Sequence, residues 1–288
     1  DVYKRQLNMF TSFGEMNNTN IFDLEFNSSE YIHLITEIER RAYADRATHL
    51  GDEDFWQVPS EMLLSEKYAN ERVQNISIDK STASDDIKAG ISPFSVSEET
   101  THYSVIDKYG NAVSVTTTIN SGYGSGITVT GAGFILNNEM DDFSSKPGVP
   151  NMFGLIGNEA NAIEAFKRPL SSMTPTLAVK DGKPYLILGT PGGSTIITTV
   201  LQNILNVVVH KMNIKEAVDA PRFHSQWLPD QIDYEKNSLS KRTANKLKLL
   251  GHKLDQRGYI GEANGIMIDN SMYIGGADRR GENTAVGY

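Results

Sequence analysis

The spacing of apolar residues changes at Thr100–Thr101, and this change most constrains the fold. Before it, apolar residues recur at helical spacing over 31–42, and Gly51 is placed to end that helix. After it, apolar and polar residues alternate through Tyr103 and Val105, which is the period of a strand. Strand patterns and helix patterns then interleave to the end of the chain. The sequence therefore predicts an α+β fold.

Turn residues and apolar spacing predict the elements that follow. Hairpins are expected with turns at 108–111, 180–183 and 269–270, and helices over 193–212, 214–220 and 240–250. The broad apolar stripe of 193–212 is typical of core packing. Residues 77–99 mix Ser, Asp, Lys, Gly and Pro without a period. We expect an exposed linker there, suited to backbone cleavage.

Composition argues against several classes of function. The 288 residues carry 27 basic and 36 acidic side chains, and the net charge of −9 argues against a nucleic-acid partner. The chain has 0 cysteines, which excludes disulfides, thiolate metal sites and a cysteine nucleophile. No run approaches the ~18 apolar residues of a membrane span. Residues 1–6 lack the apolar segment of a signal peptide, and we interpret them as a cloning or assembly junction.

Thr100 is a candidate nucleophile. A threonine hydroxyl needs a base, and a threonine at a new N-terminus carries one in its own α-amine, which titrates near ~8. Cleavage between Glu99 and Thr100 would therefore place nucleophile and base on one residue. Adjacent threonines before a strand are also ordinary strand formers. These residues alone leave both interpretations open.

Several motifs follow one another along the chain. They are the run 100–120, NNEMDD at 137–142, KRPLSSM at 167–173, GTPGGS at 189–194 and APRFH at 220–224. Together they resemble the γ-glutamyltransferase (glutathione hydrolase) family, in its bacterial form, which belongs to the N-terminal-nucleophile hydrolases. The resemblance implies that 1–99 is the mostly helical C-terminal end of a large subunit, ending in the linker. Residues 100–288 then form a complete small, catalytic subunit.

The resemblance implies a four-layer αββα sandwich to which both subunits of a heterodimer contribute. We expect the sandwich to be incomplete here because the upstream part of the large subunit is missing. The resemblance also implies which residues carry out catalysis. Thr100 becomes the nucleophile after autocleavage of the Glu99–Thr100 bond, and Thr118 hydrogen-bonds to it. The amides of Gly192 and Gly193 form the oxyanion hole.

Substrate contacts are implied in the same way. Asn120, Glu139 and Asp142 bind the α-amino-acid end of the donor, where carboxylates pair with its ammonium group. Ser171 and Ser172 bind its α-carboxylate, together with an arginine of the large subunit that is expected upstream of Asp1.

The segment 146–154 resembles the lid loop of bacterial members, with Pro147 and Gly148 at its bends. Phe153 stands there in place of the commoner tyrosine. Arg168 is a candidate for a structural role. The six histidines show no metal-ligand spacing, and no metal or other cofactor is expected.

The implied activity is γ-glutamyl transfer and hydrolysis, with glutathione and other γ-glutamyl compounds as donors. Water, amino acids or peptides are the acceptors, and the location is periplasmic or secreted. One alternative is a cephalosporin or glutaryl acylase of the same family, against which Asn120, Glu139 and Asp142 argue. Another is an inactive, unprocessed fragment. We expect this chain by itself to be inactive.

Overall fold

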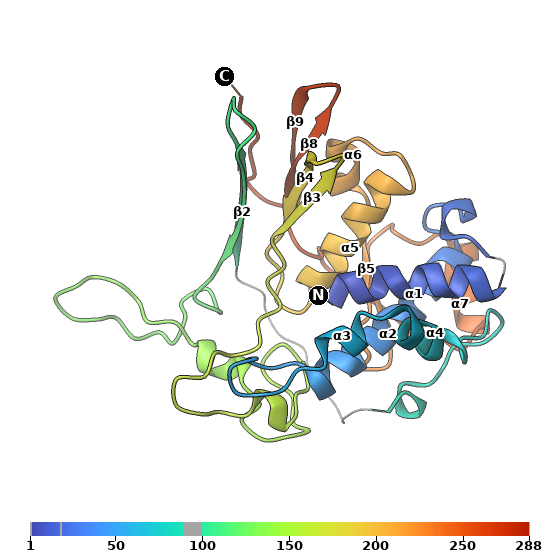
Figure 1. The fold of residues 1–288 in the computed structure, drawn as a ribbon, viewed down its shortest axis with the longest axis horizontal. Helices are drawn as coiled ribbons and strands as arrows, with labels where there is room; N and C mark the ends of the chain where they lie inside the picture. Colours follow the sequence, from blue (N-terminus) through green and yellow to red (C-terminus); the bar gives the residue numbers. More distant parts are fainter. Residues whose placement is uncertain (1, 18, 89–99, 288) are drawn as a thin grey trace. The chain divides into compact units, whose positions relative to one another are not determined.

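The computed structural model describes residues 2–17, 19–88 and 100–287. The chain divides into two compact units that interleave along the sequence (Figure 1). The first unit comprises Asp1–Val96, Met140–Ser171 and Phe223–Gly258, and the second comprises Ser97–Glu139, Ser172–Arg222 and Tyr259–Tyr288. Two segments that follow Thr100 therefore pack in the same unit as the residues that precede the expected cleavage site.

Helices dominate the first unit. They are α1 (Val2–Asn17), α2 (Ser29–His49), α3 (Ser60–Leu63), α4 (Glu66–Val73) and α7 (Lys241–Leu249), with short 3-10 turns at Ile21–Asp23, Ser84–Asp86 and Glu159–Asn161. A small sheet joins β5 (Phe223–His224) antiparallel to β6 (Ile232–Glu235), and β6 parallel to β7 (Leu254–Arg257). The helices expected in the first hundred residues and over 240–250 are thus confirmed.

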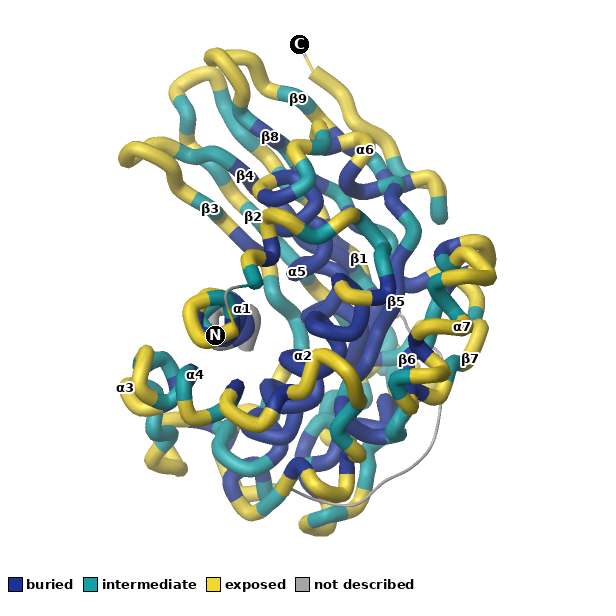
Figure 2. Tube along the Cα trace, turned by 90° about the vertical axis from the view of Figure 1, so that its right-hand side faces the viewer, coloured by how far each residue is buried: buried dark blue, intermediate teal, exposed yellow. Residues whose placement is uncertain are grey.

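Helix α2 is buried on nearly all sides, including its charged residues (Figure 2). Ser28 begins it by accepting a hydrogen bond from the N–H of Tyr31 at 3.1 Å. Arg41 donates to Glu37 at 2.8 Å within the helix, and Glu37 also accepts from the N–H of Thr82 at 2.9 Å. Buried charges require such partners, because each has lost its hydration.

Other partners of α2 lie far along the chain. Arg40 forms an ion pair with Asp230 at 2.7 Å, and Arg46 donates to the carbonyl oxygen of Leu170 at 3.3 Å. The imidazole rings of His33 and His252 share a hydrogen bond of 2.7 Å. All three partners follow residue 99 in the sequence. The first unit is therefore held by polar contacts between the two sides of the expected cleavage site.

The second unit contains two β-structures and two helices. The antiparallel ladder of β1 (Thr101–Ile106) and β2 (Ala112–Thr117) packs against β4 and β8. Those strands belong to an antiparallel sheet in the order β3 (Thr176–Lys180), β4 (Lys183–Gly189), β8 (Asn264–Asp269) and β9 (Met272–Ala277). Helices α5 (Thr195–Val208) and α6 (Ile214–Asp219) pack against this sheet. The α+β class is confirmed.

The predicted hairpins form, with one change in a turn. At 108–111 the Asp107 carboxylate accepts the N–H groups of Tyr109 and Asn111 at 2.8 and 2.9 Å. The last turn was expected at 269–270, but it lies at Asn270 and Ser271, whose φ angles are 45° and 66°. The shift by one residue follows from the register, which still pairs Asp269 with Met272.

Helix α5 is shorter than the predicted span of 193–212. Its first helical residue is Thr195, because Gly192 and Gly193 take φ angles of 139° and 52° that a helix does not allow. Beyond its C-terminus, Lys211 has a φ of 58°, which turns the chain away. The expected core role of the helix is confirmed, since nearly all of it is buried.

One face of the β1–β2 ladder is apolar and open. Tyr103, Val105 and Val113 alternate with inward-facing residues and are 50%, 52% and 49% exposed. In the described part of the second unit, helices α5 and α6 pack against the sheet of β3, β4, β8 and β9. The expected αββα sandwich requires a further helical layer over this face.

Within the described part of the chain, no helix combines the length and apolar character needed to cross a membrane.

We predict that buried histidines make stability depend on pH. Burial lowers the pKa of His252 from 6.5 to about 3, with smaller contributions from Arg40 and His33. The unfolded state then binds a proton that the folded state does not, so stability falls as the pH drops below 6.5. Between pH 6.5 and 5 this group alone should cost about 2 kcal/mol.

Urea titrations at the two pH values measure this loss. The variant His252→Gln should be less stable at neutral pH but should lose about 2 kcal/mol less between them. His49→Gln, at the partly exposed end of α2, is the control. Equal pH slopes for His252→Gln and wild type would contradict the prediction.

Candidate active site

Thr100 lies directly before β1 and is half-buried. The ladder pairs Thr101 with Thr117, the residues that follow Thr100 and precede Thr118. Thr100 and Thr118 therefore lie at the same end of the ladder, and the hydrogen bond expected between them stays a prediction.

Glu99 lies outside the described residues, as do residues 89–98 of the expected linker. Its described part, residues 77–88, is mostly exposed as expected, but it forms a 3-10 turn at Ser84–Asp86 and buries Ser84 and Ile87.

Hydrogen bonds join Asn120 to Asn138, the residue that precedes Glu139. The N–H of Asn120 donates to the hydroxyl of Thr118 at 2.8 Å, and its side chain donates to the carbonyl oxygen of Asn138 at 3.3 Å. The N–H of Asn138 in turn donates to Ile119 at 3.2 Å. Asn120 is buried, with a left-handed φ of 78°. These bonds hold Asn120 and Glu139 at the same end of the ladder as Thr100.

Gly192 and Gly193 form a buried turn at the start of α5. The carbonyl oxygen of Gly192 accepts from the N–H and the hydroxyl of Thr195 at 2.9 and 2.8 Å, which closes the turn. Among the described residues, neither glycine N–H donates to a protein acceptor. Unbonded N–H groups at a helix N-terminus, where the dipole is positive, suit a negatively charged oxygen.

Strand β4, which leads to this turn, lies in close contact with the β1–β2 ladder. The ring of His102 lies against Gly189, where a Cβ atom would come within 2.2 Å of it. The hydroxyl of Ser114 donates to the carbonyl oxygen of Leu188 at 3.1 Å. The residues just after Thr100 and those just before Gly192 are therefore fixed against each other. The sequence offered only weak signals for this contact, namely a glycine at a strand end and a histidine on an inward face.

The ring of His102 is held in place by two hydroxyls. Its ring nitrogens bond to the hydroxyls of Thr116 and Ser104 at 2.8 and 3.0 Å. Burial lowers the pKa of His102 to about 4. The ring is therefore neutral at pH 7.

The other predicted site residues belong to the first unit, apart from Ser172, which begins a segment of the second. Asp142 ends the 3-10 turn Glu139–Asp142, and its carbonyl oxygen accepts from the Asn161 amide at 2.7 Å. Ser171 is exposed. The substrate-binding roles of Asp142, Ser171 and Ser172 stay predictions.

The expected lid loop is tied to residues outside it by hydrogen bonds. Asp141 accepts the N–H of Met152 at 2.8 Å, which gives this carboxylate a structural role. Pro147 is exposed, and Gly148 has a left-handed φ of 76°. Phe153 is buried, and its carbonyl oxygen accepts from Gln226 at 3.2 Å. The function of the loop as a lid stays a prediction.

Arg168 has the structural role expected for it. Its Nε donates to Asp52 Oδ2 at 2.9 Å, and its Nη2 bonds to Asp52 Oδ1 and, at 2.7 Å, to Asp54. These bonds hold the pKa of Asp52 well below its usual range. They also fix the chain just before Ser171.

A group that could hold a metal ion lies elsewhere in the first unit. Ligand atoms of His33, Glu37 and His252 lie within 4.8 Å of one another. The two histidines are bonded to each other, however, and Glu37 accepts from Arg41 and the N–H of Thr82. Because these ligand atoms already have protein partners and two arginines lie beside them, we assign no metal here.

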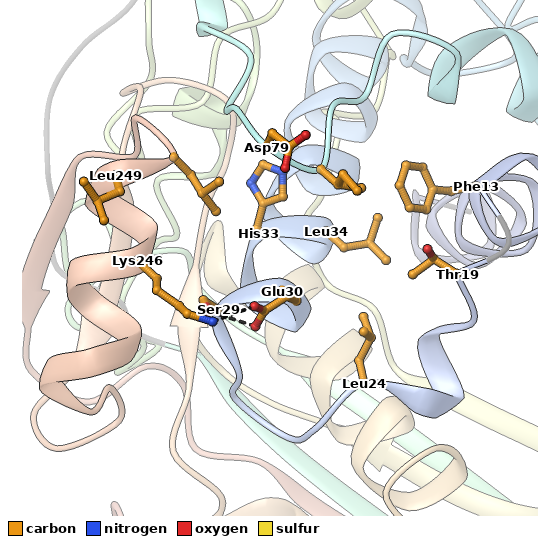
Figure 3. Close-up of a pocket in the computed structure, with 12 residues that line it drawn as sticks. Phe13, Thr19, Leu24, Ser29, Glu30, His33, Leu34, Asp79, Lys246 and Leu249 are labelled. Atoms are coloured by element: carbon orange, nitrogen blue, oxygen red, sulfur yellow. Dashed lines mark hydrogen bonds and ion pairs between the residues drawn. The ribbon is translucent and has the colours of Figure 1, made fainter.

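A cavity of about 440 Å³ also lies in the first unit (Figure 3). Apolar side chains of α1, α2 and α7 line it, and the ion pair between Lys246 and Glu30, at 2.9 Å, lies on one side. None of the predicted catalytic or substrate-binding residues lines this cavity. It is therefore distinct from the group around Thr100.

Comparisons with known proteins agree on one family. A family model described as Gamma-glutamyltranspeptidase matches residues 5–288. A glutathione hydrolase proenzyme of Escherichia coli (strain K12) is 46% identical over 273 residues, which cover 93% of this chain and 47% of that protein. One of Bacillus subtilis (strain 168) is 39% identical and covers 93% and 46%. The chain thus spans about half the length of these curated relatives.

Solved structures give the same result. A Helicobacter pylori gamma-glutamyltranspeptidase T380A mutant is 54% identical, with a TM-score of 0.62, over 63% of this chain and 100% of that chain. A cephalosporin acylase from Bacillus halodurans has a TM-score of 0.76 over 98% of this chain and 48% of that one. Its identity is 23%, so this second likeness shows the fold alone.

We predict that Gly189→Ala disrupts the site through His102. The new Cβ would meet the imidazole ring at 2.2 Å, so the ring or the strand must move. Such overpacking should cost about 1–3 kcal/mol of the free energy of unfolding, measured by urea titration. Gly258→Ala is the matched control, since no atom lies within 4 Å of its added Cβ. Equal stability of the two variants would refute the close contact.

Proposed function

Because this chain belongs to the gamma-glutamyltranspeptidase family, we propose that the complete protein transfers and hydrolyses γ-glutamyl groups through an ester on Thr100. The observation that carries the proposal is that the candidate nucleophile and the glycine turn belong to the same unit. Thr100 and Thr118 lie at the same end of the ladder, and the contact of β1 with β4 supports a site that includes the strand leading to Gly192 and Gly193. A nucleophile and unbonded N–H donors are what acyl transfer requires.

Maturation comes first in this mechanism. The hydroxyl of Thr100 attacks the carbonyl carbon of Glu99, and the peptide C–N bond breaks as the nitrogen takes up a proton. The acyl group has then moved from nitrogen to oxygen. Hydrolysis of this ester releases the carboxylate of Glu99 and leaves Thr100 with a free α-amine, the base that its hydroxyl needs.

Turnover uses the same hydroxyl. The α-amine accepts its proton while the oxygen attacks the γ-carbonyl carbon of the donor. The N–H groups of Gly192 and Gly193 bind the oxyanion, and one such donor is typically worth ~2.7–4 kcal/mol. The C–N bond of the donor breaks, and its amine leaves with the proton. Water, or the amine of an amino acid or peptide, then attacks the Thr100 ester and releases the γ-glutamyl group.

In this proposal the protein recognises a γ-glutamyl donor by the two charged groups of its amino-acid end, the ammonium and the carboxylate. Glu139 and Asp142 begin and end one 3-10 turn, a spacing at which side chains project from the same side. With Asn120 they would bind the ammonium group, and Ser171 and Ser172 the carboxylate. Glutathione as donor, a heterodimer of two subunits and a periplasmic or secreted location are parts of the same proposal.

A glutaryl or cephalosporin acylase is the alternative within this family. A glutaryl group has no ammonium, so it gives two carboxylates on one turn nothing to pair with. The presence of Glu139 and Asp142 therefore favours a γ-glutamyl donor. Comparing γ-glutamyl and glutaryl anilides as substrates distinguishes the two.

We predict that the complete protein is cleaved between Glu99 and Thr100. Mass spectrometry should find a product that begins at Thr100, and Thr100→Ala should stay uncleaved and inactive on a γ-glutamyl anilide. The 288-residue chain expressed alone is the comparison, and we expect no activity from it. Cleavage at another bond would refute Thr100 as the nucleophile.

We predict that Asp142→Ala weakens donor binding while cleavage still occurs. The substrate ammonium needs a negative partner, whereas cleavage at Thr100 does not. Loss of this hydrogen bond to a charged group should cost ~1.5–3 kcal/mol in kcat/KM. Glu159→Ala, which removes an exposed acid from another 3-10 turn, is the control. An unchanged kcat/KM in cleaved Asp142→Ala would rule out this role.

A further inference from the structure

Thr190 joins the end of β4 to the segment that precedes β8. Its hydroxyl donates to the carbonyl oxygen of Pro191 at 2.6 Å and accepts the N–H of Glu262 at 2.9 Å. The side chain is fully buried. Gly192 and Gly193 follow, and glycines have no side chain to restrict their backbone. Thr190 therefore ties the start of this turn to a second part of the unit.

The segment that Thr190 reaches, residues 260–263, is itself fixed. Arg222 donates to the carbonyl oxygens of Ile260 and Gly261 at 2.6 and 3.1 Å. Asp278 pairs with Arg222 at 2.6 Å, and both side chains are buried. A buried, charge-assisted pair is strong and directional. This segment thus gives Thr190 a rigid partner.

Gly261 allows the two segments to touch. Its φ is 63°, and a Cβ there would lie 2.7 Å from the hydroxyl of Thr190. The same Cβ would lie 3.1 Å from the carbonyl oxygen of Pro191 and 3.2 Å from the hydroxyl of Thr199 in α5. A side chain at this position would therefore push Thr190 and the turn after it away.

The geometry points to Thr190 and Gly261 as positioning residues that aim the N–H groups of Gly192 and Gly193. This inference rests on the proposed function, which assigns those N–H groups to the oxyanion. Without the hydroxyl of Thr190, Thr195 still closes the glycine turn, but the start of the turn loses its tie to Glu262 and the N–H groups lose their direction. The residues proposed to bind the donor's amino-acid end are not touched. The loss should therefore fall on kcat and spare KM.

Kinetics of the complete, cleaved protein test this expectation with a γ-glutamyl anilide. Thr190→Val, which keeps the shape and removes the hydroxyl, should lower kcat at least tenfold with KM within twofold. Thr190→Ser should stay within threefold of wild type. Thr176→Val removes another buried hydroxyl, one that donates to the carbonyl oxygen of Thr174 at 2.9 Å, and should leave kcat unchanged. A wild-type kcat in Thr190→Val, or an equal loss in Thr176→Val, would overturn the inference.

Hydrogen exchange separates this inference from the proposed function. The N–H groups of Thr195 and Glu262, which donate to Gly192 and to the hydroxyl of Thr190, should exchange at least fivefold faster in Thr190→Val and Gly261→Ala than in wild type, and at the wild-type rate in Thr190→Ser. Exchange that does not accelerate would overturn the inference whatever the activity. A wild-type protein that does not turn over the anilide, but shows the acceleration in these variants, would overturn only the proposed function. The measurement requires no cleavage, so it also covers a variant that fails to mature.

Discussion

Helix α2 holds the first unit together through buried arginines that have partners elsewhere in the unit. A buried arginine or carboxylate without a partner costs several kcal/mol, so each of these charges fixes the segment that it meets. Arg40 meets Asp230, and Arg46 meets the carbonyl oxygen of Leu170. These contacts join the residues before Glu99 to those after Thr100. Backbone cleavage between the two would therefore leave both pieces bound.

The second unit depends on close backbone approach as well as on the buried ion pair of Arg222 and Asp278. Gly189 gives space to the ring of His102, and Gly261 gives space to the hydroxyl of Thr190. Both contacts lie at the end of β4, so one strand positions the glycine turn against the start of β1. A methyl group added at either glycine would need space that the neighbouring atoms already occupy. Two glycines thus determine where the N–H groups lie relative to the ladder that carries Thr100.

The chemistry of this site needs few titratable side chains. His102 is neutral because burial lowers its pKa to about 4, and its ring nitrogens bond to hydroxyls. The N–H groups of Gly192 and Gly193, which have no acceptor among the described residues, supply polarity and do not titrate. A base for Thr100 then has to come from elsewhere, and a free α-amine at the same residue supplies it. Maturation and catalysis are linked in the proposed mechanism for this reason.

The sequence by itself determined the element types and the candidate residues. Strand alternation at Tyr103 and Val105, the turn residues and the helical spacing of α2 are local signals, which act within a few residues. The order of the motifs along the chain, through their resemblance to one family, pointed to Thr100. Only the tertiary structure decided that Thr190 reaches Glu262, because the two lie 72 residues apart and no local spacing records the contact. The burial of the charged face of α2 was decided there too, since charged residues at helical spacing ordinarily face solvent.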